Sequence, residues 1–121
     1  MAAPNIVQVA SLLGKTSGIA LTTGGVDILE NPAASGKVLK VSSLYVPNID
    51  GSNAADATVN FVDATGPTTL RLASTVPVPP DKTLIVIDRD APLYLEEGDK
   101  ITGVASANGD LEAVVSYEEL S

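Results

Sequence analysis

The chain has 121 residues, of which 45% are hydrophobic, and a formal net charge of −8 at pH 7. This length forms one domain with a core of its own, and the hydrophobic content excludes a mainly disordered chain. Cysteine and histidine are absent, which removes disulfides, thiolate nucleophiles, the usual general base and the commonest metal ligand. We therefore expect neither an enzyme nor a cofactor.

The negative charge is concentrated in the last third of the chain. Residues 1–79 contain five acidic and four basic residues (net −1), whereas residues 80–121 contain ten acidic and three basic ones (net −7). An acidic surface repels phosphate backbones, so we expect no nucleic-acid partner. The start of the chain lacks a basic stretch before an apolar run, and no apolar run is long enough to span a bilayer. We therefore expect synthesis in the cytoplasm without a signal peptide, and no membrane partner.

Short strand patterns separated by turn residues fill the first half of the chain. The pattern predicts strands at Ile6–Val9, Gly18–Thr22, Val26–Leu29, Val38–Val46 and Ala57–Val62. Gly24-Gly25 is expected to be a turn and not a phosphate cradle, because no Lys-Ser/Thr pair follows it. Pro47 lacks an amide hydrogen and should end the fourth strand.

The second half continues the pattern. Leu70–Leu72 should be a strand with Leu70 and Leu72 pointing inward. The proline-rich stretch Val76–Pro80 has few hydrogen-bond donors and suits a sheet edge or a crossing between sheets. Thr83–Ile87 is apolar on both faces, which is typical of a central strand.

The last thirty residues contain three apolar stretches, Leu93–Leu95, Ile101–Ala105 and Leu111–Tyr117, separated by turn residues. An Asn-Gly pair between strand-forming runs is a strong hairpin signal. Asn108-Gly109 therefore predicts a tight hairpin between the strands at Ile101 and Leu111, and the chain should end in paired antiparallel strands.

No window keeps apolar positions at helical spacing, so we expect eight to ten strands and less than about a tenth helix. The predicted fold is all-β: a single-domain antiparallel β-sandwich, either jelly-roll or immunoglobulin-like, with the jelly-roll slightly favoured. Residues 1–25 carry apolar runs and a single charge, Lys15. They are expected to form an N-terminal arm or added strands, and residues 26–121 the β-sandwich domain.

Three polar clusters are candidate sites. Oxygen-bearing side chains at Asp50, Asn53 and Asp56, or within Glu96–Asp99, have the chemistry of a Ca²⁺ site, but both also fit ordinary solvated turns. Asp88-Arg89-Asp90 fits a strand exit with a local salt bridge. We favour these plainer interpretations and predict no catalytic, cofactor-binding or metal-binding residue. The few aromatic rings should pack in the core or an interface and not stack on sugars: Tyr45, Phe61, Tyr94 and Tyr117.

Several landmarks resemble small virion structural proteins of tailed bacteriophages. The resemblance covers roughly residues 26–121 and rests on Gly36–Val46 with Asn48, Val76–Pro79, Thr83-Leu84, Pro92–Asp99 and Val114–Glu119. It implies a β-sandwich that serves as a head decoration (cement), tail or neck component, binds other virion proteins and has no catalytic residues.

The leading hypothesis is therefore a capsid decoration or cement protein that resides in the virion and stabilises the head lattice. Its expected partners are the major capsid protein or another virion protein, and further copies of itself. A trimer would match threefold positions on a head. The alternatives are a tail, neck or fibre component, and a carbohydrate- or host-surface-binding module.

Overall fold

The computed structural model describes residues 11–121, and the strand predicted at Ile6–Val9 lies outside them. Nine strands run through the described residues, and no helix occurs there, so the all-β prediction and the predicted strand number are confirmed. Consequently no helix in this part of the chain is long and apolar enough to cross a membrane. The strands are β1 (Leu12–Ala20), β2 (Val26–Glu30), β3 (Val38–Pro47), β4 (Ala55–Asp63), β5 (Thr68–Val78), β6 (Thr83–Ile87), β7 (Leu93–Leu95), β8 (Lys100–Ala105) and β9 (Glu112–Leu120).

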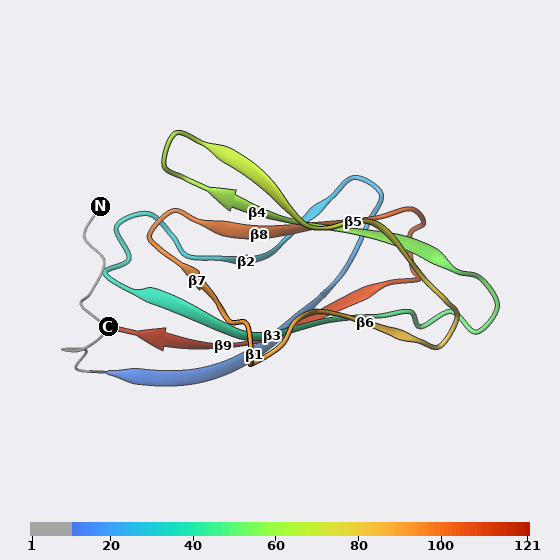
Figure 1. Cartoon of the computed structure of the whole chain (residues 1–121), viewed down its shortest axis with the longest axis horizontal. Coiled ribbons are helices and arrows are strands. Elements are labelled where there is room, and N and C mark those ends of the chain that lie inside the picture. Colours follow the sequence, from blue (N-terminus) through green and yellow to red (C-terminus); the bar gives the residue numbers. More distant parts are fainter. Residues whose placement is uncertain (1–10) are drawn as a thin grey trace.

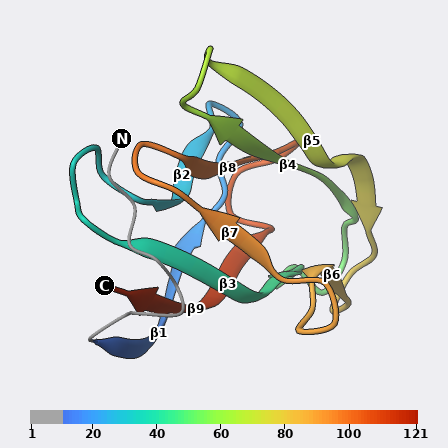
Figure 2. The same cartoon turned by 60° about the vertical axis from the view of Figure 1, so that its left-hand side comes forward.

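The strands form two antiparallel sheets packed face to face. Sheet A has the order β1-β9-β3-β6, with the short β7 also paired to β3, and sheet B has the order β2-β8-β4-β5. In Figure 1 sheet B lies above sheet A, and Figure 2 shows the two layers from the end. The prediction of a single-domain β-sandwich is confirmed.

The strand order is that of a jelly-roll. Early strands pair with late ones in a nested series: β1 with β9, β2 with β8, β3 with β6 and β7, and β4 with β5. The chain thus forms one long doubled-over hairpin whose successive pairs alternate between the sheets, as in jelly-rolls built from two Greek keys. An immunoglobulin-like sandwich instead places its first two strands side by side in one sheet. Here β1 and β2 belong to different sheets.

The core between the sheets is aliphatic, and it follows the alternation of the strands. β8 illustrates this, because Ile101, Gly103 and Ala105 point into the core while the residues between them are half-buried. Gly103 is required by close packing, since a Cβ there would lie 2.8 Å from the side chains of both Leu21 and Ile28. The largest fully buried side chains include Leu21, Leu44, Leu95, Ile101, Leu111, Val41, Val46, Val59, Val78 and Val115.

The predicted terminal hairpin is wrong. β8 lies in sheet B and β9 in sheet A, so the segment containing Asn108-Gly109 crosses between the layers. The turn chemistry itself was interpreted correctly, because Gly109 has a φ of 84°. Asn108 accepts a 2.9 Å hydrogen bond from the Thr23 amide in the β1–β2 loop. Packing two sheets about 10 Å apart over one core outweighed the local preference for pairing neighbours. For the same reason β7 pairs with β3 and with neither later strand.

Two predictions about the edge strands are also wrong. Thr83–Ile87 is not a central strand: β6 ends the order of sheet A, and Ile85 is 58% exposed. Leu70 does not point into the core, and it is 55% exposed, although Leu72 packs against the core. Leu70 lies opposite Phe61 near the end of the β4–β5 hairpin, where an outermost strand receives little cover from the other sheet. Hydrophobicity alone did not distinguish inner from outer strands.

The other edge prediction is confirmed. Val76–Val78 lies in β5 at the edge of sheet B, and the chain then crosses to β6 in sheet A. Pro47 ends β3 as expected. Gly24-Gly25 forms a turn, in which Gly25 has a φ of 88° and its amide donates to the Thr22 carbonyl.

Candidate interaction surface

The first acidic cluster is a turn. Asp50 Oδ1 accepts hydrogen bonds from the amides of Ser52 (2.7 Å) and Asn53 (3.2 Å). These backbone bonds, that of Ser52 first, lower the pKa of Asp50. The Asp56 amide instead donates to Ser106 Oγ, 50 residues away. The bonds to Asp50 show a turn, as predicted. Within residues 11–121 no group of three or more His, Cys, Asp or Glu side chains is placed to hold a metal ion, and the absence of a metal ligand stays a prediction.

A buried asparagine, Asn48, holds this turn in place by hydrogen bonds. Asn48 is 3% exposed, and its Nδ2 donates to the carbonyls of Asn53 and Val78 at 2.9 Å each. Its Oδ1 accepts the Asp50 amide at 2.9 Å. Across the turn, desolvation and the charge of Asp50 raise the pKa of Asp110. The polar groups at this end of the sandwich therefore hold loops together.

The turn Glu96–Asp99 is not solvated as expected. Glu97 and Asp99 are 3% and 4% exposed. Asp99 accepts the amides of Ala64 and Glu96 at 3.0 Å each, and Glu97 Oε2 accepts the Gly36 amide at 3.1 Å. Buried backbone amides need acceptors, and these carboxylates supply them. The carboxylates thus join three loops at the opposite end of the sandwich.

The third cluster is a strand exit, as predicted, but its salt bridge is absent. Asp88 Oδ1 accepts the Asp90 amide at 3.0 Å and closes the turn after β6. The ion pairs among residues 11–121 are Lys15–Glu119, Lys37–Glu119 and Lys100–Asp27, and none involves Arg89. The Asp88 carboxylate satisfies a backbone amide instead of pairing with its neighbour.

The aromatic prediction is confirmed for two of the four rings, and packing of the other two in an interface stays a prediction. Phe61 and Tyr117 pack against the core, whereas Tyr45 and Tyr94 are 39% and 42% exposed. Tyr45 lies on the outer face of sheet A, beside a shallow depression of about 510 Å³ lined also by Ser43, Asp88 and Arg89. Nothing in the local sequence distinguishes the exposed rings from the packed ones.

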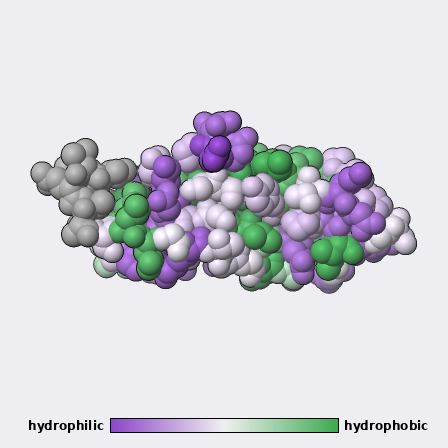
Figure 3. Space-filling view, turned by 90° about the horizontal axis from the view of Figure 1, so that it is seen from below, coloured by the Kyte–Doolittle hydropathy of each residue, from purple (hydrophilic) through white to green (hydrophobic). Residues whose placement is uncertain are grey.

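An apolar row crosses the outer face of sheet A. The register places Val114 of β9 opposite Tyr45 of β3, and Tyr45 opposite Ile85 of β6. Directly opposed residues lie on the same face of a sheet, and the three side chains are 37%, 39% and 58% exposed. Sequence reasoning missed this row, because its members become neighbours only when the register of three distant strands is known. Seen from the sheet A side, hydrophobic patches alternate with hydrophilic ones (Figure 3).

Next to the apolar row runs a polar one. Thr16, Ser116 and Ser43 are aligned across β1, β9 and β3, and Thr16 Oγ1 and Ser116 Oγ are 3.0 Å apart. A bulge between Val41 and Ser43 displaces Ser42 from the ladder. Thr16, Ser116 and Ser42 border an open depression of about 470 Å³.

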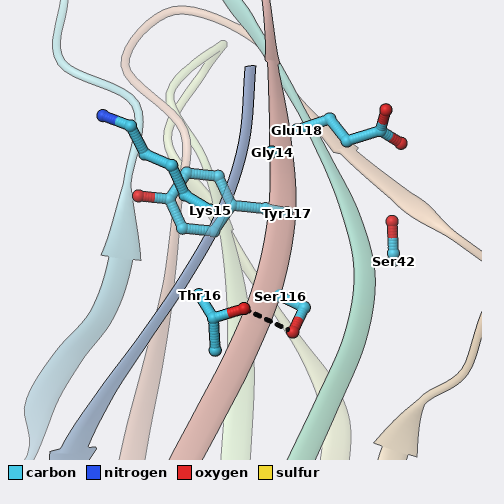
Figure 4. Close-up of a pocket in the computed structure, with 7 residues that line it drawn as sticks. All are labelled: Gly14, Lys15, Thr16, Ser42, Ser116, Tyr117 and Glu118. Carbon is cyan, nitrogen blue, oxygen red and sulfur yellow. Dashed lines mark hydrogen bonds between the residues drawn. The ribbon is translucent and has the colours of Figure 1, made fainter. Parts of the chain in front are cut away.

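The depression is not an enclosed site. Lys15 and Tyr117 project to one side of β9, whereas Ser42 and Glu118 lie on the other (Figure 4). Its lining residues therefore belong to both faces of the sheet, and they are Gly14, Lys15, Thr16, Ser42, Ser116, Tyr117 and Glu118. A surface of this shape suits contact with another macromolecule better than capture of a small ligand.

Glu119 of β9 joins β1 to the residue that precedes β3. Its two carboxylate oxygens lie 3.3 Å from Lys15 Nζ and 3.2 Å from Lys37 Nζ. Desolvation raises the pKa of Glu119, but the hydrogen bonds and charges of Lys37 and Lys15 outweigh it and leave the pKa below its ordinary value. The one charge on β1 is therefore paired within the chain.

β1 is exposed along its whole length. All nine of its residues pair with β9, and every one of them is exposed to solvent. The strand is longer than the predicted Gly18–Thr22 segment and starts at Leu12, because pairing with β9 overrides the weak strand preference of its glycines. Whether residues 1–25 behave as an arm stays a prediction, and residues 1–10 lie outside the described part.

Comparison with known proteins identifies the fold. No protein-family model matches the chain, and no curated protein matches its sequence. Among solved structures, the chain is similar to the Bacillus endospore appendages that form disulfide-linked pili, with a TM-score of 0.51 and 11% identity over 92% of this chain and 88% of that one. At this identity the likeness extends to the fold alone.

Two viral structures are more distant. A pentameric capsid protein isolated from metagenomic phage sequences gives a TM-score of 0.39 and 18% identity over 87% of this chain, which spans 60% of that protein. The structure of infectious bursal disease virus, Gt strain, gives a TM-score of 0.36 and 14% identity over 93% of this chain, which spans 32% of the viral chain.

Proposed function

We propose that this chain is a virion structural protein, and that it acts as a decoration or cement subunit on the head of a tailed bacteriophage. The observation that carries the proposal is the outer face of sheet A. There the apolar row Val114–Tyr45–Ile85 lies in the open, next to an exposed strand β1. Apolar and aromatic side chains that cross a sheet face supply the anchors of protein–protein interfaces.

The distribution of polar groups supports a structural role. The buried side chains at the two ends of the sandwich hold loops, since Asp99 and Asn48 bond backbone amides and carbonyls. The jelly-roll is a common scaffold for capsid and lectin domains. The resemblance of residues 26–121 to phage virion proteins points to the first of these.

The proposed partner is the major capsid protein or another virion protein, with further copies of the chain in the assembly. A trimer would match threefold lattice positions, whereas other closed symmetries would match other positions. A location in the tail or neck involves the same kind of contact, and imaging of the particle by cryo-electron microscopy distinguishes these locations.

The test is rebinding to phage particles that lack the protein. Replacing both Tyr45 and Ile85 by serine removes the two largest side chains of the row, and we expect binding to weaken about tenfold or more. Leu70→Ser is the matched control, because Leu70 is similarly exposed but lies on sheet B. Unchanged binding of the double variant would exclude this face as the contact.

The predicted contribution of the N-terminal region is tested separately. If residues 1–25 include a contact arm, a chain lacking residues 2–12 stays folded and no longer rebinds. If the segment belongs to the fold, the truncated chain is insoluble. A soluble truncation that rebinds with unchanged affinity contradicts the contact.

One observation favours a second candidate, a carbohydrate-binding module. Tyr45 is exposed beside a depression that also contains Arg89 and Asp90, and exposed rings flanked by polar groups can stack on sugars. Binding on a glycan array, lost in Tyr45→Ala, would support this function, and an array without binding would exclude it.

A further inference from the structure

We infer that two copies of this chain join through their β1 strands, edge to edge and antiparallel, with a twofold axis at Thr16. The inference concerns the chain itself and does not depend on the proposed virion function. It rests on three observations: the lack of protection along this edge, the direction of its backbone groups, and the symmetry of its sequence.

Among residues 11–121, nothing protects the β1 edge in the way that the other edges are protected. Native sheets protect their edges by short strands, prolines, bulges or charges. β2 has only five residues and a bulge between Asp27 and Leu29, and β5 contains Pro77 and register shifts along its ladder with β4. β6 also has five residues. β1 has nine residues in continuous register with β9 and contains no proline, and its one charged residue, Lys15, is paired with Glu119.

The backbone of β1 presents alternate residues to solvent. Ser11 and Ser121 exchange both amide–carbonyl bonds, at 2.9 and 3.0 Å, and the Leu21 amide donates to the Leu111 carbonyl at 2.9 Å. Antiparallel ladders alternate between bonded and non-bonded pairs. The odd-numbered residues of β1 therefore bond to β9, and the even-numbered residues direct their amides and carbonyls to the open edge.

The sequence of β1 is nearly a palindrome in chemical type. It reads Leu-Leu-Gly-Lys-Thr-Ser-Gly-Ile-Ala from Leu12 to Ala20. An antiparallel partner centred on Thr16 would place Leu13 opposite Ile19 of the second copy, Gly14 opposite Gly18, Lys15 opposite Ser17, and Thr16 opposite its own equivalent. Each apolar residue meets an apolar one and each glycine meets a glycine, while opposed threonines form a favourable cross-strand pair.

Pairing in this register would bury apolar side chains that are exposed in the single chain. Leu13 and Ile19 are 50% and 39% exposed, although Ile19 lies opposite the buried Ala113 of β9. In the inferred ladder Leu13 and Ile19 form the closer, non-hydrogen-bonded type of pair. Lys15, which would otherwise repel the second Lys15, lies 3.3 Å from the Glu119 carboxylate, and this pairing reduces the repulsion.

A second copy fits this edge better than a strand of another protein. Self-pairing around one residue requires the two halves of the strand to match each other, and a foreign strand imposes no such requirement. The pairing forms a continuous sheet from the two copies of sheet A. It leaves the outer face, with Tyr45 and Ile85, available for other contacts.

A charge-exchange cycle at Leu13 and Ile19 tests this register. The measurement is the molar mass of the full chain by sedimentation across a range of concentrations. We expect Leu13→Lys and Ile19→Glu alone to weaken the dimer about tenfold or more. Combining them places the new lysine of each copy opposite the new glutamate of the other, so the double variant should recover most of the dimer and become sensitive to salt. Only a register with Leu13 against Ile19 predicts this recovery.

Thr16→Pro provides an independent variant. The Thr16 amide points to the open edge, so proline there removes no backbone hydrogen bond within the monomer and loses only the exposed side-chain contact with Ser116. We expect a folded monomer, whereas Ser17→Pro, which removes an amide bonded to β9, should destabilise the fold itself. A wild-type chain that is monomeric at all concentrations would overturn the inference. So would a dimer or trimer unaffected by Leu13→Lys and Thr16→Pro.

Discussion

Strands β1 and β8 each contain glycine in antiparallel ladders, but their surroundings are opposite. β8 lies inside sheet B between β2 and β4, and a Cβ on Gly103 would clash with two core side chains. β1 lies at the edge of sheet A, and a Cβ on Gly14 would meet nothing within 4 Å. The glycine of β8 is needed to close the core, whereas Gly14 of β1 lies at an open edge. The comparison separates the part of the molecule that maintains the fold from the part available for assembly.

The largest effect should come from filling the space at Gly103. Gly103→Val overpacks the core against Leu21 and Ile28 and should destabilise the fold by about 3 kcal/mol. Gly14→Val is the matched control and should change stability by less than about 0.5 kcal/mol. Urea denaturation at a concentration where the chain does not self-associate measures both. Equal losses of stability from the two substitutions would contradict the distinction between the packed core at β8 and the open edge at β1.

A smaller loss of stability is expected from substitution of the buried Asn48 at one end of the sandwich. Asn48→Ala leaves the carbonyls of Asn53 and Val78 and the Asp50 amide without their partner, and should cost about 2 kcal/mol. Asn53→Ala removes only a 3.4 Å contact with Asp50 from an exposed side chain and should cost about 0.5 kcal/mol or less. The same denaturation experiment decides the order, and an Asn53 variant as unstable as the Asn48 variant would contradict it.

The smallest loss of stability should come from Glu119 of β9, which forms an ion pair with Lys15 of the edge strand β1. Its folded-state pKa lies below the ordinary value of 4.5, so its ionised form stabilises the fold fully above that pH. This contribution is lost as the pH falls through the folded-state pKa. Glu119→Gln should therefore be less stable than the wild type at neutral pH, and the difference should shrink toward zero as the pH falls through the folded-state pKa of Glu119. A difference that stays constant over this range would exclude the charge as its source.

Glu118→Gln is the control for this pH series. Glu118 neighbours Glu119 on β9 but forms no ion pair among residues 11–121. Its substitution should leave the pH dependence of stability close to that of the wild type.

The sequence predicted the secondary structure better than the pairing. Alternation at Ala57 and Val59, the break at Pro47 and the edge character of Val76–Val78 are local properties, and all three are confirmed. Asn108-Gly109 shows the limit of local signals. Its positive φ at Gly109 followed from residue type, but its connection of two sheets depended on where β8 and β9 find their partners.

The candidate surface was less predictable for a related reason. Glu97 and Asp99 have the sequence pattern of a solvated turn, and only the docking of the loops at Gly36 and Ala64 makes them buried acceptors. Likewise Tyr45, Ile85 and Val114 are ordinary strand residues until the register of β3, β6 and β9 aligns them. Both features arise from contacts between segments far apart in the chain.

The nested pairing of the strands also has a consequence for the time course of folding. β4 and β5 are neighbours in sequence, whereas β1 and β9 are separated by almost the whole chain. Because closing long loops costs entropy before the contacts are gained, we expect the β4–β5 hairpin to form early and β1 to dock last. Until β1 docks, the edge of β9 stays uncovered and can pair with the β1 strand of any copy. Completion of the monomer and the first contact between copies would then depend on the same strand. Synthesis of many copies close together would therefore favour exchange of β1 between neighbouring chains.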